Sequence, residues 1–132
     1  MPILRQSIID RQDLHLNRSV LYLFGDNLAG KGMGGQAKAM RGEPNAIGVP
    51  TKKRPSMEPG SFFSDADYDD VVPLISARLQ RAVRHLQNGG VVIIPAAGLG
   101  TDRARLREMA PSIADFLDAE IAALAAINLK SM

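Results

Sequence analysis

The sequence predicts a single α/β domain over residues 1–132, with a mostly parallel, mixed sheet between layers of helices. Apolar runs of strand length alternate along the chain with segments of helical periodicity, which is typical of strands joined by crossover helices. The chain length and a hydrophobic content of 45% are sufficient for one domain with a core of its own. We therefore expect a three-layer α/β/α arrangement.

Four segments are expected to form strands. The runs 20–24, 46–49 and 91–94 are short and nearly all apolar, as is typical of strands that are covered on both faces. The segment 3–9 has two short apolar patches and is expected to form an edge strand. Pro50 is expected to end the second of the apolar runs.

Three helices connect or follow these strands. The clearest spans Asp67–Gln87, where apolar residues recur on one face with a period of 3.6 residues. Pro73 fits this helix only if it lies in the first turn. A short helix is expected over Gln36–Arg41, and Pro111 is expected to begin the last helix.

Glycine-rich loops follow two of the strands. The first contains Gly30, Gly32, Gly34 and Gly35 and leads into the short helix, and the second spans 95–102. Glycines bring backbone N–H groups close to a ligand, and a helix N-terminus favours an anion. Because parallel strands place their carboxyl ends at one edge, both loops and the segment 51–53 are expected to share a rim. This arrangement predicts a site for phosphate or a nucleotide.

Several side chains at this rim have either a chemical or a structural interpretation. Asn27 could hold ribose hydroxyls or stabilise a turn, and Asp26 could bind the backbone of the first loop. Lys38 could pair with phosphate or act as a nucleophile, or it could be a solvated helix lysine, and Arg41 competes for the same role. Asp102 could be a general base or a helix N-cap.

Composition excludes several classes of site. The chain has no cysteine, which excludes disulfides and thiolate metal sites, and no histidine and carboxylate residues have the spacing of metal ligands. A net charge of +2 gives no broad basic field for duplex nucleic acid. No segment is apolar enough to span a membrane, and Met1–Asp10 lacks the apolar core of a signal peptide. We therefore expect a cytoplasmic protein with no metal, no cofactor and no membrane partner.

These motifs resemble those of the macrodomains, small α/β domains that bind ADP-ribose. In macrodomains a strand ends in an asparagine, and a glycine-rich loop and a helix follow, as here at Asn27 and in Gly32-Met33-Gly34-Gly35-Gln36-Ala37. A later strand ends in proline and a Gly-x-Gly loop, as here in Ile94-Pro95-Ala96-Ala97-Gly98-Leu99-Gly100. The resemblance covers most of the chain from Val20 onward.

Within that superfamily the sequence is similar to the branch of terminal ADP-ribose protein glycohydrolase and the antitoxins that remove ADP-ribose from DNA. That branch has a Met-Gly-x-Gly-like loop, a lysine in the next helix, a Thr-Lys pair and a Gly-x-Gly-x-Asp loop. The matching residues are Met33-Gly34-Gly35, Lys38 or Arg41, Thr51-Lys52-Lys53 and Gly98-Leu99-Gly100-Thr101-Asp102. The resemblance implies a lysine that attacks the distal ribose and an aspartate that assists release of ADP-ribose.

The leading hypothesis is an ADP-ribose-binding domain that hydrolyses ADP-ribosyl adducts on protein, nucleic acid or small molecules. Lys38 and Asp102 are its expected catalytic residues. Gly34 stands where other macrodomain hydrolases carry an aspartate, so binding is better supported than hydrolysis. The residues expected to contact the ligand are Asp26, Asn27, Gly32, Met33, Gly34, Gly35, Gln36, Thr51, Lys52, Ala97, Gly98, Leu99, Gly100 and Thr101.

Two alternatives stay open. The first is a reader that binds ADP-ribose or a related nucleotide without cleaving it. The second is a Rossmann-like nucleotide-binding or phosphoribohydrolase protein, because the run 95–101 is similar to the PGGxGT loop of those proteins. Such proteins have glycines where this chain has Ala96 and Ala97, and they lack a glycine loop like that at residues 30–35.

Overall fold

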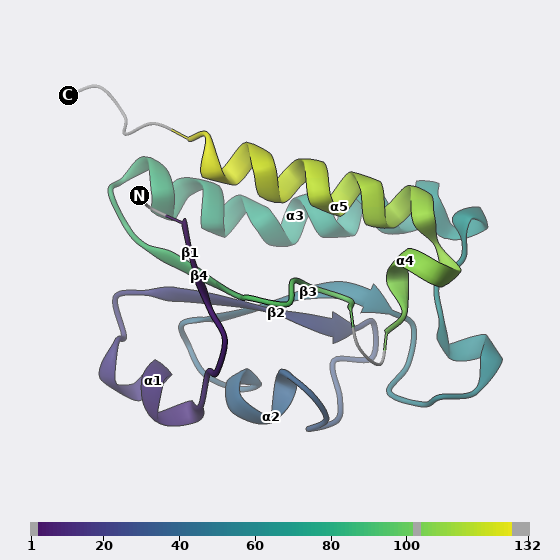
Figure 1. Ribbon diagram of the computed structural model, residues 1–132, viewed down its shortest axis with the longest axis horizontal. Coiled ribbons are helices and arrows are strands. Elements are labelled where there is room, and N and C mark those ends of the chain that lie inside the picture. Colours follow the sequence, from purple (N-terminus) through teal and green to yellow (C-terminus); the bar gives the residue numbers. More distant parts are fainter. Residues whose placement is uncertain (1–2, 102–103, 128–132) are drawn as a thin grey trace.

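The computed structural model describes residues 3–101 and 104–127, which form an α/β fold with helices on both faces of one sheet (Figure 1). Helices α1 (Arg11–Leu16) and α2 (Ala37–Met40) cover one face, and α3 (Tyr68–Gln87) and α5 (Pro111–Ala125) cover the other. A further short helix, α4 (Leu106–Met109), precedes α5. In this described part of the chain, no helix is long and apolar enough to cross a membrane.

The sheet has four strands in the order β1-β4-β2-β3, and every neighbouring pair is parallel. The expected mixed sheet is therefore all parallel within the described residues. The segment 3–9 does contain an edge strand, as expected, because β1 pairs with β4 alone. The strands are β1 (Ile3–Gln6), β2 (Leu21–Asn27), β3 (Ala46–Lys52) and β4 (Val92–Pro95).

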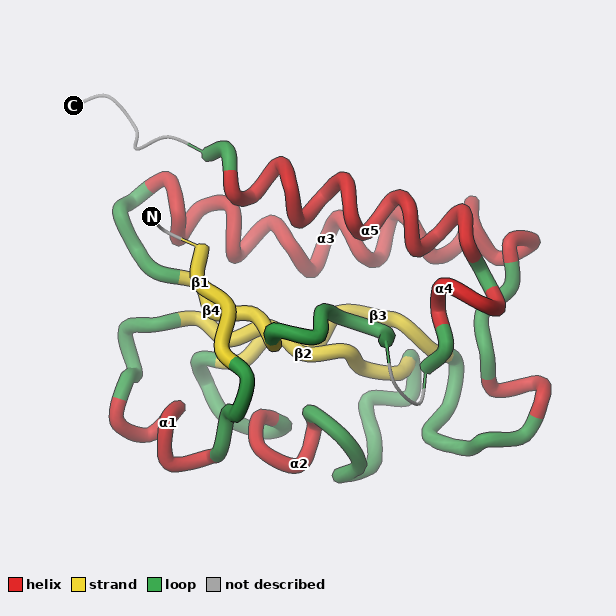
Figure 2. Tube along the Cα trace, in the orientation of Figure 1, coloured by secondary structure: helices red, strands yellow, loops and turns green. Residues whose placement is uncertain are grey.

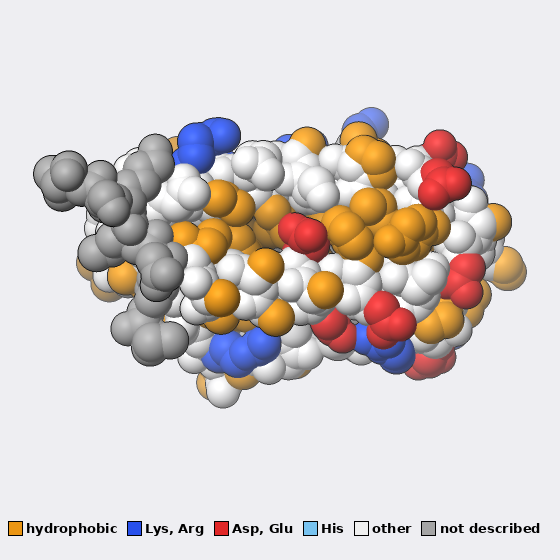
Figure 3. Space-filling model, turned by 90° about the horizontal axis from the view of Figure 1, so that it is seen from above, with side chains coloured by type: hydrophobic (Ala, Val, Ile, Leu, Met, Phe, Trp, Pro, Cys, Tyr) orange, Lys and Arg blue, Asp and Glu red, His pale blue; other side chains and the backbone are white. Residues whose placement is uncertain are grey.

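Strand β2 shows why the sheet is buried on both sides. Leu21 and Leu23 belong to the large core cluster with α3 and α5, whereas Tyr22 and Phe24 belong to a smaller cluster under α1 and α2. Successive side chains of a strand point to opposite faces, so a nearly continuous apolar run packs against both helical layers. The outer surface of the layer formed by α3 and α5 carries a band of hydrophobic side chains, with acidic side chains toward one end (Figure 3).

Two expectations about proline were wrong. Pro50 lies inside β3 and is paired with Asp26, because β3 is an edge strand that needs hydrogen-bond donors toward one neighbour only. Pro73 lies beyond the first turn of α3, where it has no N–H to donate to the carbonyl of Asp69. The rest of the 20-residue helix packs its apolar face on the core and continues through this position.

Local signals account for most helix ends. Asp10 and Asp13 form a reciprocal capping box at α1, each side chain accepting from the other's backbone N–H at 3.0 Å. Pro111 begins α5, as expected, and Asp65 accepts hydrogen bonds from the backbone and hydroxyl of Ser112. These bonds lower the pKa of Asp65 and tie the start of α5 to the short helix η2 (Asp65–Asp67).

The segment 51–64 has no helix or strand periodicity in its sequence, but the structure anchors most of it. Its first two residues belong to β3, and Pro59–Ser61 forms the short helix η1. Phe62 and Phe63 are both buried. Figure 2 shows the loops after β2, β3 and β4 gathered at one end of the sheet, beside α4. This end carries the candidate site.

Candidate functional site

A cavity of about 940 Å³ opens at the carboxyl ends of the strands. Segments that follow all four strands line it, which confirms that the two glycine loops and the end of β3 share one rim. Its size is typical of a small-molecule site. The lining residues are Ser7–Arg11, Gly25–Asn27, Lys31–Arg41, Thr51, Lys52, Pro55, Pro95, Ala97, Gly100, Thr101 and Ala104.

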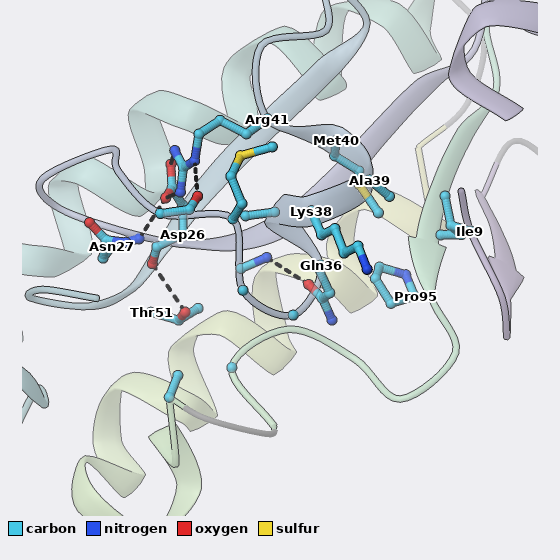
Figure 4. Close-up of a pocket in the computed structure, with 18 of the residues that line it drawn as sticks. Ile9, Asp26, Asn27, Gln36, Lys38, Ala39, Met40, Arg41, Thr51 and Pro95 are labelled. Carbon is cyan, nitrogen blue, oxygen red and sulfur yellow. Dashed lines mark hydrogen bonds and ion pairs between the residues drawn. The ribbon is translucent and has the colours of Figure 1, made fainter. Parts of the chain in front are cut away.

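Gln36 joins the two glycine loops. Its Oε1 accepts from the N–H of Gly25 at 2.8 Å, and its Nε2 donates to the carbonyl of Gly98 at 3.0 Å. A dashed line in Figure 4 marks the hydrogen bond that the side-chain oxygen of Gln36 accepts. A Cβ on Gly25 would lie 3.1 Å from Oγ1 of Thr51 and 3.3 Å from the backbone N of Gly100, so β2, β3 and the second loop pack closely at this point. The expected ligand residue Gln36 thus builds the cavity wall.

Thr51 brings the end of β3 to the same point. The side chain is buried, and its hydroxyl donates to the carbonyl of Asp26 at 3.2 Å (Figure 4). Gly100 has φ +74°, and a Cβ there would lie 3.1 Å from Cβ of Thr51. Glycine at position 100 therefore serves both the left-handed backbone and the close packing of the loop on β3.

Asp26 and Arg41 form a bidentate ion pair that holds the first glycine loop. The Arg41 guanidinium lies 2.5 Å and 3.2 Å from the two carboxylate oxygens of Asp26, and it also donates to the carbonyls of Gly32 and Lys31. It lies over the ring of Phe24, with 5.6 Å between the guanidinium carbon and the ring centroid. Arg41 therefore has a structural role, which leaves Lys38 as the cation of α2 that can face a ligand.

The side chain of Asn27 stabilises the turn that follows β2. Its Nδ2 donates to the carbonyl of Lys31 at 2.8 Å, and the carbonyl of Asn27 accepts from the N–H of Gly30 at 3.0 Å. In Figure 4 Asn27 lies beside the Asp26–Arg41 pair, away from Lys38. The structural interpretation of this residue is the one that the contacts favour, although Asn27 does line the cavity.

Two lysines of the cavity have different environments. Lys38 is exposed and extends toward Pro95 (Figure 4), and no residue in the ranges 3–101 and 104–127 forms an ion pair or hydrogen bond with its ammonium. Lys52 is only 7% exposed, with Nζ 3.3 Å from Sδ of Met57 and 4.9 Å from the centroid of the Phe62 ring. Sequence reasoning assigned the reactive amine to Lys38 and did not foresee that, of these two lysines, Lys52 has the buried side chain.

Only some of the expected ligand residues in the second glycine loop line the cavity. Ala97, Gly100 and Thr101 line the cavity, whereas the side chain of Leu99 is buried in the core. Gly98 does not line the cavity but contributes its carbonyl to Gln36. In the first loop the expected residues Gly32, Met33, Gly34 and Gly35 all line the cavity. Asp102, the expected acid or base, lies outside the described residues.

The segment after β1 also lines the cavity, and sequence reasoning missed it. Arg11 donates to the carbonyls of Lys38 and Arg41 at 2.9 and 3.0 Å and to Glu43 at 2.6 Å, so α1 holds the end of α2. Arg11, together with Arg18 and His15, lowers the pKa of Glu43 to about 2. The available signal was the parallel edge strand itself, because its carboxyl end had to reach the same rim.

The charged groups that line the cavity suit an anionic ligand. Among the described residues, no group of three or more His, Cys, Asp or Glu side chains could hold a metal ion. The lining includes five cationic side chains, those of Arg11, Lys31, Lys38, Arg41 and Lys52, and two acidic ones, those of Asp10 and Asp26. The cationic excess and the exposed glycine backbone could both bind phosphate groups.

Comparison with known proteins gives a family. No curated protein and no solved structure matches the chain. Residues 4–120 match a family of unknown function, DUF7831. The matched range includes both glycine loops and all four strands except for Ile3, the first residue of β1. Because this match spans most of the chain, the protein belongs to the family DUF7831.

Proposed function

We propose that this protein binds ADP-ribose, or a related nucleotide with a diphosphate, in the cavity at the carboxyl ends of its strands. The observation that carries the proposal is the bridge that Gln36 makes between the two glycine loops. It places two stretches of glycine-rich backbone on one cavity of about 940 Å³, so that each can face one phosphate of a diphosphate.

The same cavity supports a hydrolytic role. Lysine amines can act as nucleophiles, and the buried Lys52, whose Nζ lies beside the Phe62 ring, is a better candidate than the exposed Lys38. In the proposed reaction the neutral amine forms a bond to the anomeric carbon of the distal ribose, the bond to the attached group breaks, and that group leaves with the proton that the amine gives up. Water then breaks the carbon–nitrogen bond, which releases ADP-ribose and restores the lysine amine. A reader without turnover is the competing function, and turnover assays separate the two.

Calorimetric titration with ADP-ribose, AMP, NAD and cyclic ADP-ribose tests the binding proposal. We expect ADP-ribose to bind most tightly. Preference for AMP would favour the phosphoribohydrolase-like alternative, and binding of none of the four would contradict the proposal. A matched pair of variants places the site. Ala97→Glu puts a carboxylate into the cavity lining and should weaken binding at least tenfold, whereas Ala96→Glu, exposed but outside the lining, should not.

A further inference from the structure

We propose that Arg105 is a positioning residue of the cavity, which holds the second glycine loop in place by stacking on Phe62. The inference rests on the proposed function, in which this loop faces a phosphate group. Arg105 does not itself line the cavity, but its neighbour Ala104 does. Three features support this role: the left-handed backbone of Arg105, the contact of its side chain with Phe62, and the hydrogen bond between Leu106 and Gly100.

Arg105 has a left-handed backbone, with φ 46° and ψ 41°. Among the described residues it is the non-glycine residue with positive φ. A side chain such as arginine disfavours this conformation, which persists where the surroundings impose it and occurs most often at functional sites. Glycine or asparagine would adopt it more easily, so the arginine side chain must contribute something else here.

The side chain contributes a stacking contact. The guanidinium carbon of Arg105 lies 5.8 Å from the centroid of the Phe62 ring, within the range of a cation–π interaction. Nζ of Lys52, which lines the cavity, lies 4.9 Å from the same centroid. Phe62 is itself buried, so it is a fixed platform. Through this ring the residue that precedes α4 is connected to the last residue of β3.

The contact acts on the second glycine loop through Leu106, the residue after Arg105. The N–H of Leu106 donates to the carbonyl of Gly100 at 3.0 Å. Gly100 in turn packs tightly between Leu106 and Thr51. If Arg105 is held on Phe62, Leu106 and Gly100 are held against β3, and the lining residues Gly100, Thr101 and Ala104 keep their places.

Three variants separate this role from a merely structural one. Arg105→Ala removes the stack and keeps the strained backbone, whereas Arg105→Gly removes the stack and relieves the strain. Arg107→Ala is the control, because Arg107 lies two residues away in α4 and pairs with Asp115 and Asp118 on the surface. The measurements are thermal unfolding, hydrogen exchange of the Leu106 amide and ADP-ribose affinity.

We expect Arg105→Gly to be more stable to heat than Arg105→Ala. Both should exchange the Leu106 amide about tenfold faster than the wild type and should bind ADP-ribose about tenfold more weakly. Arg107→Ala should match the wild type in exchange and affinity. Arg105→Ala within twofold of the wild type in both readouts would overturn the inference. Wild-type affinity in Arg105→Gly would also overturn the inference, because it would show that ADP-ribose binding depends on the backbone strain at position 105 and not on the arginine side chain.

The two proposals can fail separately. If the wild-type protein binds no ADP-ribose, the proposed function fails, and amide exchange in the ligand-free protein still decides whether Arg105 holds the loop. If the wild type binds ADP-ribose and Leu106 exchanges equally fast in all four proteins, the inference on Arg105 fails alone.

Discussion

Gln36 and Gly98 lie 62 positions apart in the chain and are joined by a hydrogen bond of 3.0 Å from the side chain of one to the carbonyl of the other. The side-chain oxygen of Gln36 accepts a hydrogen bond from the N–H of Gly25. A primary amide suits this position because it carries a donor and an acceptor in one rigid plane. One side chain thus sets the distance between the two glycine loops, and the proposed diphosphate site depends on that distance.

Gln36→Glu should uncouple the loops. The carboxylate can still accept from Gly25, but its second oxygen faces the carbonyl of Gly98 and cannot donate to it. We expect ADP-ribose affinity to fall at least tenfold, or about 1.4 kcal/mol, in calorimetric titrations. Gln80→Glu, exposed on α3 on the opposite side of the sheet, makes the same charge change and should bind like the wild type.

Gly48→Ala should disturb the first loop through Asp26. The added Cβ would lie 2.5 Å from Oδ2 of Asp26 and displace the carboxylate from Arg41, which holds the backbone of Gly32. We expect a loss of about 1–3 kcal/mol in the free energy of unfolding, measured by chemical denaturation. In an Asp26→Ala background the nearest clash is gone, so the substitution should cost clearly less. An equal cost in both backgrounds would show that the carboxylate is not what the new methyl group meets.

Glu43 should make stability depend on pH in an acidic window. Hydrogen bonds from Arg11 and Arg18, with His15, lower its pKa from 4.5 to about 2 in the folded protein. The folded state therefore favours the ionised carboxylate, so this contribution is complete above pH 4.5 and is lost as the pH falls toward 2. We expect the stability advantage of the wild type over Glu43→Gln to shrink across that window in denaturation curves. An advantage that stays constant from pH 6 to about pH 2 would contradict the assignment.

The proposed catalysis should depend on Lys52 more than on Lys38. Lys52→Met removes the amine and leaves an unbranched side chain of similar length beside Phe62, and Lys38→Met is the matched change at an exposed position. We expect Lys52→Met to lower release of ADP-ribose at least a hundredfold, or about 2.7 kcal/mol, and Lys38→Met to lower it less than threefold. The reverse order would restore Lys38 as the reactive amine.

Asp102 gives a separate test of the acid or base. Asp102→Ala should abolish turnover while it leaves ADP-ribose affinity within about tenfold, roughly 1.4 kcal/mol. The comparison uses single-turnover release from an ADP-ribosylated substrate and calorimetry on the same protein preparation. Normal turnover by this variant would show that the aspartate has no part in the chemistry.

The elements with strong periodicity could be predicted from the sequence. The periodic apolar positions of α3 and the apolar runs of β2, β3 and β4 identify these elements in the sequence, because burial on one or two faces determines which positions are apolar. Pro50 and Pro73 could not be placed correctly, since their tolerance depends on an edge position and on tertiary packing. Helix α4 is four residues long and too short to show a period.

The location of the site followed from topology, but the roles of its side chains did not. Parallel strands place their ends together, so both glycine loops were expected at one rim. The partners of Gln36 and Arg41 are backbone groups or a carboxylate 9 to 62 positions away, and no local pattern reports such contacts. The burial of Lys52 could not be predicted from the sequence, because Phe62, the ring beside its ammonium, lies beyond η1 in the chain.

The most direct test of the account is an amide chemical-shift titration of the isotope-labelled protein with ADP-ribose. We predict that the amides of Gly34, Gly35 and Gln36 and those of Gly98 and Gly100 shift together, with one dissociation constant, because a single diphosphate contacts both loops. Shifts confined to one loop, or two loops that titrate with different constants, would contradict a shared site.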